Sequence, residues 1–96
     1  MTLDEIRLTK REDILRLAAE RGVRNVRIFG SVARGDNDSH SDIDFLVDLD
    51  PGTSLMDLGG LQGDLEKLLA AKVDVVSSRG LRERVREHVF RDIVAL

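Results

Sequence analysis

Apolar positions along this chain alternate between helical stripes and short compact runs. The stripes, each opposed by a polar face, predict helices at 9–21, at 53–71 and from 80 onward, with a short helix at 30–35. The compact runs are rich in Val, Ile and Leu and predict strands at 23–29, 42–49 and 72–77, with a short strand at 93–96. This order predicts an α/β (α+β) domain in which helices flank a small mixed β-sheet.

Capping residues set several of these limits. Thr9 and Glu12 fit a capping box at the start of the first helix, and Gly22 is expected to end that helix. Thr53 or Ser54 would begin the long helix after a Pro-Gly turn. The helical segments therefore have defined starts in the sequence itself.

Apolar residues at helical spacing indicate which faces turn inward. On the long helix these are Leu55, Leu58, Leu61, Leu65, Leu68 and Leu69. On the last helix they are Leu81, Val85 and Val89. Glycines at 59, 60 and 63 weaken the long helix by about 1 kcal/mol each relative to Ala. They could instead serve close packing or a bend, and the sequence leaves these alternatives open.

Composition adds limits on size and partners. The 96 residues suffice for one domain of modest core, and the core must be built mainly from Leu, Val and Ile because there are three Phe and no Trp or Tyr. A partner surface that completes such a core is expected. There is no Cys, so disulfides and thiolate metal sites are excluded.

Charge and hydropathy exclude two further classes of partner. The net charge is −3 and the basic residues are dispersed, so no stable nucleic-acid binding is expected. No apolar stretch approaches the roughly 20 residues of a membrane span, and the N-terminal residues do not form a signal peptide. We therefore expect a cytoplasmic protein that does not associate with a membrane.

Two alternating carboxylates at the start of the second strand are the main candidate for chemistry. Asp42 and Asp44 would point the same way, about 6.6 Å apart along the backbone. Asp is disfavoured in strands, and two such charges on one face repel each other unless a cation lies between them. Oxygen ligands favour Mg²⁺ or Mn²⁺. The alternative is a pair of ordinary surface acids. Asp48 and Asp50 lie toward the next turn and are expected to be surface acids.

Asp74 is the natural third ligand, because it interrupts an otherwise apolar strand. A lone carboxylate buried there would cost several kcal/mol unless it were paired or bound to a metal. If the third strand lies beside the second, Asp74 completes a cluster of three carboxylates. An ion pair with an arginine is the alternative.

A Gly-Ser turn precedes the two carboxylates and offers a phosphate site. Gly30 lets the backbone approach a ligand, and Ser31 can donate its hydroxyl at the start of a short helix. Arg34 could bind a phosphate or could pair with Asp36 or Asp38. These residues predict a metal-dependent nucleotide site on a small domain.

These motifs resemble the signature of the DNA polymerase β-like nucleotidyltransferase superfamily, in which Gly-Ser is followed at this spacing by Asp-x-Asp. The segments 30–36 and 41–47 look like its minimal nucleotidyltransferase (MNT) branch, and 73–77 matches the strand that carries the third carboxylate. The likeness extends from the first helix to the last. Residues 1–96 are therefore expected to form a single minimal nucleotidyltransferase domain with the polymerase β-like core.

The resemblance also implies a reaction and a partner. MNT proteins are often encoded with a HEPN-domain RNase toxin, and some silence it by transferring AMP from ATP to one of its tyrosines. We therefore expect an antitoxin that is a protein adenylyltransferase, with ATP as substrate and the HEPN toxin as partner in a hetero-oligomer. Asp42 and Asp44 would hold two Mg²⁺ ions, with Mn²⁺ as the alternative, and Asp74 would hold the ion nearer the acceptor. Gly30, Ser31 and Arg34 would bind the nucleotide.

Two other functions compete with this interpretation. An antitoxin could act by binding alone, through exposed apolar residues such as Leu55, Met56, Val89 and Phe90. Nucleotidyl transfer to a small hydroxyl compound is the third possibility, and the absence of a second domain to shape its pocket counts against it.

Overall fold

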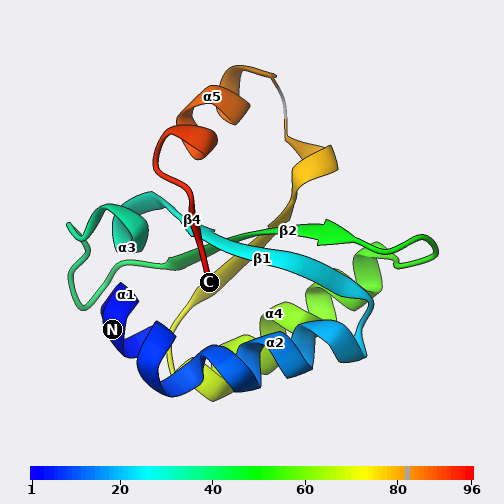
Figure 1. The fold of residues 1–96 in the computed structure, drawn as a ribbon, viewed down its shortest axis with the longest axis horizontal. Coiled ribbons are helices and arrows are strands. Elements are labelled where there is room, and N and C mark those ends of the chain that lie inside the picture. The colour runs from blue at the N-terminus through cyan, green and yellow to red at the C-terminus, as the bar shows by residue number, and fades with distance from the viewer. Residues whose placement is uncertain (82) are drawn as a thin grey trace.

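A four-stranded β-sheet in the order β3-β2-β1-β4 is the centre of the fold (Figure 1). The computed structural model describes residues 1–81 and 83–96. The strands are β1 (Val23–Phe29), β2 (Ile43–Leu49), β3 (Val73–Ser77) and β4 (Val94–Ala95). β1 is antiparallel to β2 and β4, whereas β2 and β3 are parallel. The predicted mixed sheet is confirmed, with β2 and β3 each beginning one residue later than expected.

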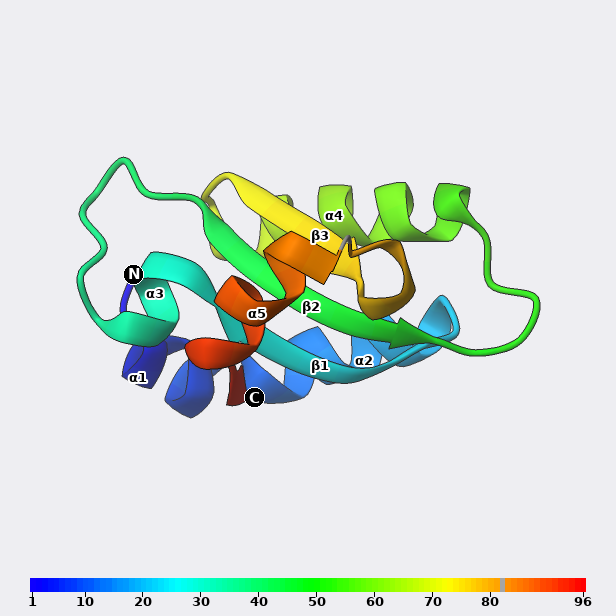
Figure 2. The same ribbon diagram turned by 90° about the horizontal axis from the view of Figure 1, so that it is seen from above.

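Helices lie on both faces of this sheet. They are α1 (Leu3–Glu5), the π-helical turn η1 (Ile6–Lys10), α2 (Arg11–Glu20), α3 (Gly30–Arg34), α4 (Leu55–Leu69), the 3-10 turn η2 (Ser78–Gly80) and α5 (Glu83–Arg91). Figure 1 shows α2 and α4 across one face and α5 over the other, and Figure 2 shows the same arrangement from above. The connection from β2 to β3 through α4 explains why those two strands are parallel, since such a connection returns the chain to the same end of the sheet.

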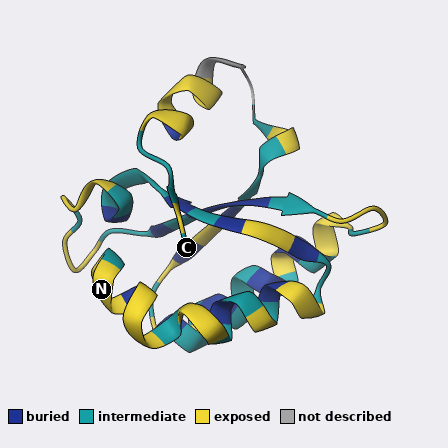
Figure 3. Ribbon diagram, viewed as in Figure 1, coloured by how far each residue is buried: buried dark blue, intermediate teal, exposed yellow. Residues whose placement is uncertain are grey.

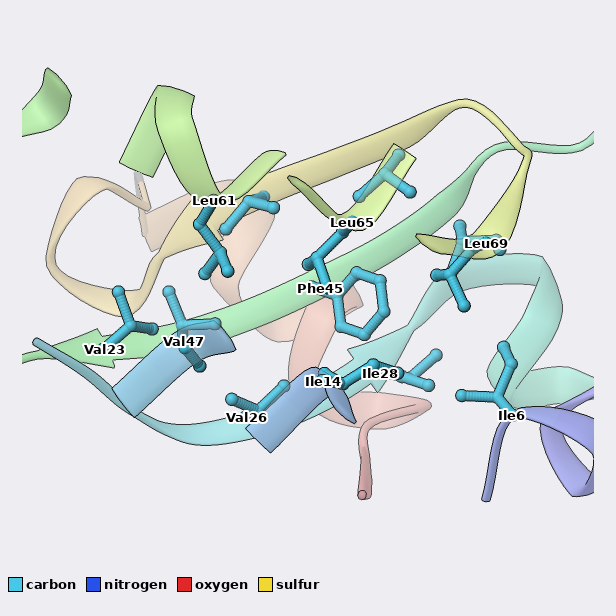
Figure 4. Packing of buried hydrophobic residues seen from close by; sticks show 14 of the residues in the cluster. Ile6, Ile14, Val23, Val26, Ile28, Phe45, Val47, Leu61, Leu65 and Leu69 are labelled. Atoms are coloured by element: carbon cyan, nitrogen blue, oxygen red, sulfur yellow. The ribbon is translucent and has the colours of Figure 1, made fainter. Parts of the chain in front are cut away.

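The main core fills the space between the sheet and the pair α2 and α4 (Figure 4). Ile43, Phe45 and Val47 alternate along β2 and are buried against these helices. The leucines of α4 that face them are Leu58, Leu61, Leu65 and Leu69. Figure 3 shows the same division, with buried residues on the inner sides of α2 and α4 and exposed residues outside.

Two apolar residues that were expected to face inward are exposed. Leu55 is 83% exposed because it is the first residue of α4, whose first turn extends past the ends of the strands (Figure 2). Val85 is also exposed, whereas Val89 on the same helix is buried. Leu46, which leaves β2 on the side opposite Phe45, is fully buried as well. The face of the sheet under α5 therefore also buries an apolar side chain.

The first helical segment begins earlier than predicted. Thr2 caps α1 by accepting a hydrogen bond from the Glu5 amide at 3.1 Å. The predicted capping box at Thr9 and Glu12 is wrong, because the Thr9 hydroxyl donates instead to the Glu5 carbonyl oxygen at 2.6 Å. A Thr hydroxyl that points to the carbonyl oxygen one helical turn earlier is turned away from the amides of the following turn, so it does not cap them. The chain is thus already helical where a start was expected.

The start of α4 follows the sequence closely. Ser54 is its N-cap, and a capping box joins Ser54 to Asp57. The Ser54 amide donates to Asp57 Oδ2 at 3.0 Å, and the Asp57 amide donates to Ser54 Oγ at 3.3 Å. Of the two predicted caps, Ser54 is therefore the one used.

The three glycines of α4 have different surroundings. A Cβ at Gly60 would meet the guanidinium of Arg21, which bonds to Asp64 Oδ2 at 2.9 Å. Nothing lies within 4 Å of a Cβ at Gly59 or Gly63. Close packing against Arg21 therefore explains the glycine at position 60, but not the glycines at 59 and 63.

This difference predicts which glycines can be replaced to stabilise the domain. Gly59→Ala and Gly63→Ala should each raise the free energy of unfolding by about 0.5–1 kcal/mol, because Ala orders the helix at a lower entropic cost. Gly60→Ala should give about zero change, since the helix gain is offset by displacement of Arg21 from Asp64. Urea denaturation of the three variants measures these values. Equal stabilisation by all three would contradict the packing role of Gly60.

Candidate active site at the start of β2

Asp44 and Asp74 lie opposite each other on the parallel strands β2 and β3. Their side chains therefore leave the same face of the sheet, opposite to the face covered by α2 and α4. The expectation that the third strand lies beside the second is confirmed. Asp74 is exposed rather than buried, because Val73 and Val75 take the inward positions and leave Asp74 on the outer face. Among the described residues, no ion pair involves Asp74.

Asp42 comes directly before β2 and is partly buried, as is Asp44. Burial, followed by the negative charges of Asp74 and Asp42, raises the pKa of Asp44 to about 6, while Arg34 acts in the opposite direction. The three carboxylates are thus close enough to oppose the ionisation of Asp44. This is the electrostatic condition that a bound cation relieves.

The Gly-Ser turn lies alongside Asp44. Phe29, at the end of β1, pairs with Asp44 across the antiparallel ladder. Gly30 follows with φ +74°, and a Cβ on it would overlap the Asp44 carboxylate. Only glycine combines this left-handed backbone with so close an approach. Ser31 follows in the first turn of α3 and is partly buried.

Arg34 is paired with acids in this structure. Its guanidinium lies 3.1 Å from Asp36 Oδ2 and 3.3 Å from Asp92 Oδ2. The pair with Asp36 is one of the alternatives that the sequence offered. Asp92 follows α5 and was not foreseen, because no local pattern connects residues so far apart in the chain. Arg34 also lowers the pKa of Asp44, so its charge acts on the carboxylate cluster.

Asp48 lies on the same side of β2 but does not belong to this cluster. It was expected to be a surface acid, yet it is partly buried and accepts three hydrogen bonds. The donors are Asn25 Nδ2 at 2.8 Å, Arg27 Nη2 at 2.8 Å and Ser78 Oγ at 2.6 Å. The hydrogen bonds from Ser78 and Asn25 lower the pKa of Asp48. Its oxygen atoms are already used, so we assign it a structural role that joins β1, β2 and η2.

The donor chemistry of the three-carboxylate cluster suits a hard divalent cation, because carboxylate oxygens are the ligands that Mg²⁺ and Mn²⁺ prefer. Within the described part of the chain, however, no group of three or more His, Asp or Glu side chains is already arranged around one ion position. Asp74 is exposed and Asp42 only partly buried, so either can change rotamer without repacking the core. The donor set therefore fits the ion, and binding would require a local rearrangement of side chains.

Among the described helices, none is both long and apolar enough to cross a membrane.

Comparisons with known proteins identify the family. Residues 10–95 match the sequence model of the nucleotidyltransferase domain. The protein adenylyltransferase MntA of Thermococcus cleftensis is 35% identical over 94 residues, which cover 98% of this chain and 95% of that protein. A solved structure described as a minimal nucleotidyltransferase is 46% identical, with a TM-score of 0.87 over 100% of this chain and 97% of the other.

More distant structures share the fold. One comes from the complex of a tri-AMPylated HEPN toxin of Shewanella oneidensis with its MNT antitoxin, with 20% identity and a TM-score of 0.67. The match covers 88% of this chain and 66% of that chain. The sequence match over nearly the whole chain, together with the matching fold, shows that this chain belongs to the nucleotidyltransferase domain family and is a minimal nucleotidyltransferase within it.

Proposed function

We propose that this domain transfers AMP from ATP to a tyrosine hydroxyl of a HEPN-domain RNase toxin and thereby acts as its antitoxin. The observation that supports the proposal most is the register of Asp44 with Asp74 beside the Gly30 turn. A relative with 35% identity is named a protein adenylyltransferase. These 96 residues contain no Tyr, so a tyrosine acceptor must lie outside them.

Asp42, Asp44 and Asp74 would hold the divalent cations, which we expect to be two Mg²⁺ ions. When bound, these ions supply neutralisation of the polyphosphate and a lower pKa for the acceptor hydroxyl. The raised pKa of Asp44 fits this assignment, because burial and the charges of Asp74 and Asp42 disfavour its ionised form, and a bound cation would offset both effects.

Other residues of the chain would place the substrates. Gly30 allows the backbone to approach the β- and γ-phosphates, and Ser31 can donate a hydrogen bond to them. Arg34 would exchange a carboxylate partner for a phosphate. Asp74 is the exposed member of the cluster and would face the acceptor. The acceptor oxygen forms a bond to the α-phosphorus, pyrophosphate leaves, and the hydroxyl proton passes to Asp74 or to solvent.

Intact-mass spectrometry tests the proposal. The domain is incubated with the proposed HEPN-domain partner, ATP and Mg²⁺, and the mass of the HEPN protein should rise by one or more AMP units. An excess of EDTA should prevent the increase. If the ATP is intact and the HEPN protein is folded, an unchanged mass of the HEPN protein would argue against adenylyl transfer.

Neutralisation by binding alone is supported by a separate observation. Leu55 and Met56 are 83% and 86% exposed at the start of α4, and Phe90 is exposed on α5, whereas Val89 is buried and drops out of this surface. Adjacent exposed apolar side chains such as Leu55 and Met56 are typical of protein contacts, whereas Phe90 lies on α5, over the opposite face of the sheet (Figure 1). If Asp42→Ala still neutralises the toxin without any change in its mass, binding is sufficient.

A further inference from the structure

β3 is an edge strand whose outward amides are bonded to side chains of α4. It pairs with β2 on one side only. On its other side the Val75 amide donates to Gln62 Oε1 at 3.2 Å, and the Val73 amide donates to Glu66 Oε2 at 3.4 Å. Both bonds are partly buried. Two helix side chains thus occupy the acceptor positions that a neighbouring strand would otherwise supply.

The spacing of the two side chains matches the spacing of the two amides. Gln62 and Glu66 are four residues apart on α4, which corresponds to about 6.0 Å along a helix axis. Val73 and Val75 are two residues apart on β3, which corresponds to about 6.6 Å along a strand. The chain runs in opposite directions along α4 and β3, so Glu66 reaches the earlier amide and Gln62 the later one. The two hydrogen bonds therefore follow from the matched spacing of α4 and β3, and neither is an isolated contact.

Asp74 lies between the two bonded residues. Its side chain has no ion-pair partner among the described residues, and its position depends on the register of β3 with β2. An edge strand with free outward amides can fray or shift, and a shift of one residue would turn Asp74 to the opposite face. Two bonds on the outer side, one on each flank of Asp74, oppose such a shift.

We propose that Gln62 and Glu66 are positioning residues that hold Asp74 in register with Asp44. The inference rests on the proposed function, since it gives Asp74 a part in metal binding and transfer. Neither side chain contacts the carboxylates. Both act through the backbone of β3, and they do so from the helix that also carries the core leucines. Groups that hydrogen-bond a metal ligand directly commonly change affinity or activity by 10- to 100-fold when removed, and we expect the lower end of this range for supports that act through the backbone.

The experiment compares Gln62→Leu, which removes the acceptor, with Gln62→Glu, which retains a carboxyl oxygen at the same distance from the backbone. Glu66→Leu and Glu66→Gln form the second pair. Lys67→Leu is the matched control, because Lys67 is exposed on the same helix. All are made in the Gly59→Ala background, which we expect to be more stable, so that the variants stay folded. Three quantities are measured: Mn²⁺ affinity by electron paramagnetic resonance, kcat and KM for AMP transfer, and hydrogen exchange of the Val73 and Val75 amides.

Removing either acceptor should weaken Mn²⁺ binding about 10-fold and lower kcat about 10-fold, with the KM for ATP changed less than about 2-fold. Exchange of the amide that has lost its partner should accelerate by about 5- to 10-fold. Gln62→Glu and Glu66→Gln should restore Mn²⁺ affinity, kcat and amide exchange to within about 3-fold of the background. Lys67→Leu should change none of these quantities. A merely structural contact would alter exchange and leave Mn²⁺ affinity and kcat as they are.

The outcomes separate this inference from the proposed function. If the background protein transfers AMP and Gln62→Leu and Glu66→Leu keep both kcat and Mn²⁺ affinity, the positioning role is overturned and the function stands. If the background protein binds Mn²⁺ but transfers no AMP, the function fails, and the Mn²⁺ affinities of the four variants still decide the positioning role. A background protein that binds no Mn²⁺ would overturn both.

Discussion

Asp44→Asn should abolish AMP transfer while making the metal-free domain more stable at neutral pH. The loss of transfer should be at least about 1,000-fold, or about 4 kcal/mol in the activation free energy, because Asn cannot supply the anionic oxygen that a divalent ion requires. Intact mass and released pyrophosphate both measure this rate. A variant that retained a tenth of the activity would exclude Asp44 as a metal ligand.

The gain in stability follows from the raised pKa of Asp44. The pKa is about 6 in the folded domain and 3.8 in its ordinary state. A folded-state pKa above the unfolded value means that the favourable contribution of the protonated group is fully present below about pH 4 and is lost as the pH rises through about 6. At pH 7.5, Asp44→Asn should therefore raise the free energy of unfolding by about 1 kcal/mol, after allowance for solvent screening of a partly exposed group. At pH 4 the difference should vanish.

Asp50→Asn is the matched control, since Asp50 follows the same strand but pairs with Arg24 at 2.9 Å, away from the cluster. It should keep full transfer activity and change stability by less than about 0.5 kcal/mol. Denaturation with urea at the two pH values compares the variants. A loss of stability in Asp44→Asn at pH 7.5 would show that burial and the neighbouring carboxylates do not destabilise the ionised form.

Much of the fold could be predicted from local patterns. Compact runs of Val, Ile and Phe defined the strands, because alternating burial along a strand appears directly in the sequence. The closeness of Asp44 and Asp74 was also foreseeable, since a strand, a long helix and a second strand favour adjacent parallel strands. Gly30 could be placed beside Asp44 because the turn and the carboxylates lie at the ends of consecutive strands.

Features that depend on tertiary contacts could not be predicted in this way. Periodicity placed Leu55 and Val85 inward, yet it does not reveal where the sheet ends. The bond between Arg34 and Asp92, and the bond from the Val75 amide of β3 to Gln62, join residues from different elements. Side-chain polarity alone makes Gln62 look like an ordinary surface residue of a helix, and only the outward amide of Val75 gives it a specific partner.

Gly30→Ala should have the second largest effect, on both stability and activity. Ala at φ +74° costs about 1–2 kcal/mol, and its Cβ would overlap the Asp44 carboxylate, so that Asp44 must move. We expect the free energy of unfolding to fall by about 2–4 kcal/mol in total and AMP transfer to fall at least about 100-fold, because displacement of a ligand by about 1 Å is enough for such a loss. Urea denaturation and the intact-mass assay measure the two effects.

Gly35→Ala separates the backbone contribution from the contact with Asp44. Gly35 has a similar φ of +80°, but nothing lies within 4 Å of a Cβ there, so this variant should lose only about 1–2 kcal/mol and keep its activity. The Asp44→Ala background tests the contribution of the contact with the Asp44 carboxylate. In that background the carboxylate is absent, and Gly30→Ala should cost about as much as Gly35→Ala does, which gives a coupling energy of about 1–2 kcal/mol between positions 30 and 44. A coupling near zero would mean that backbone conformation alone explains Gly30, and that the close approach of the turn to Asp44 has no energetic consequence.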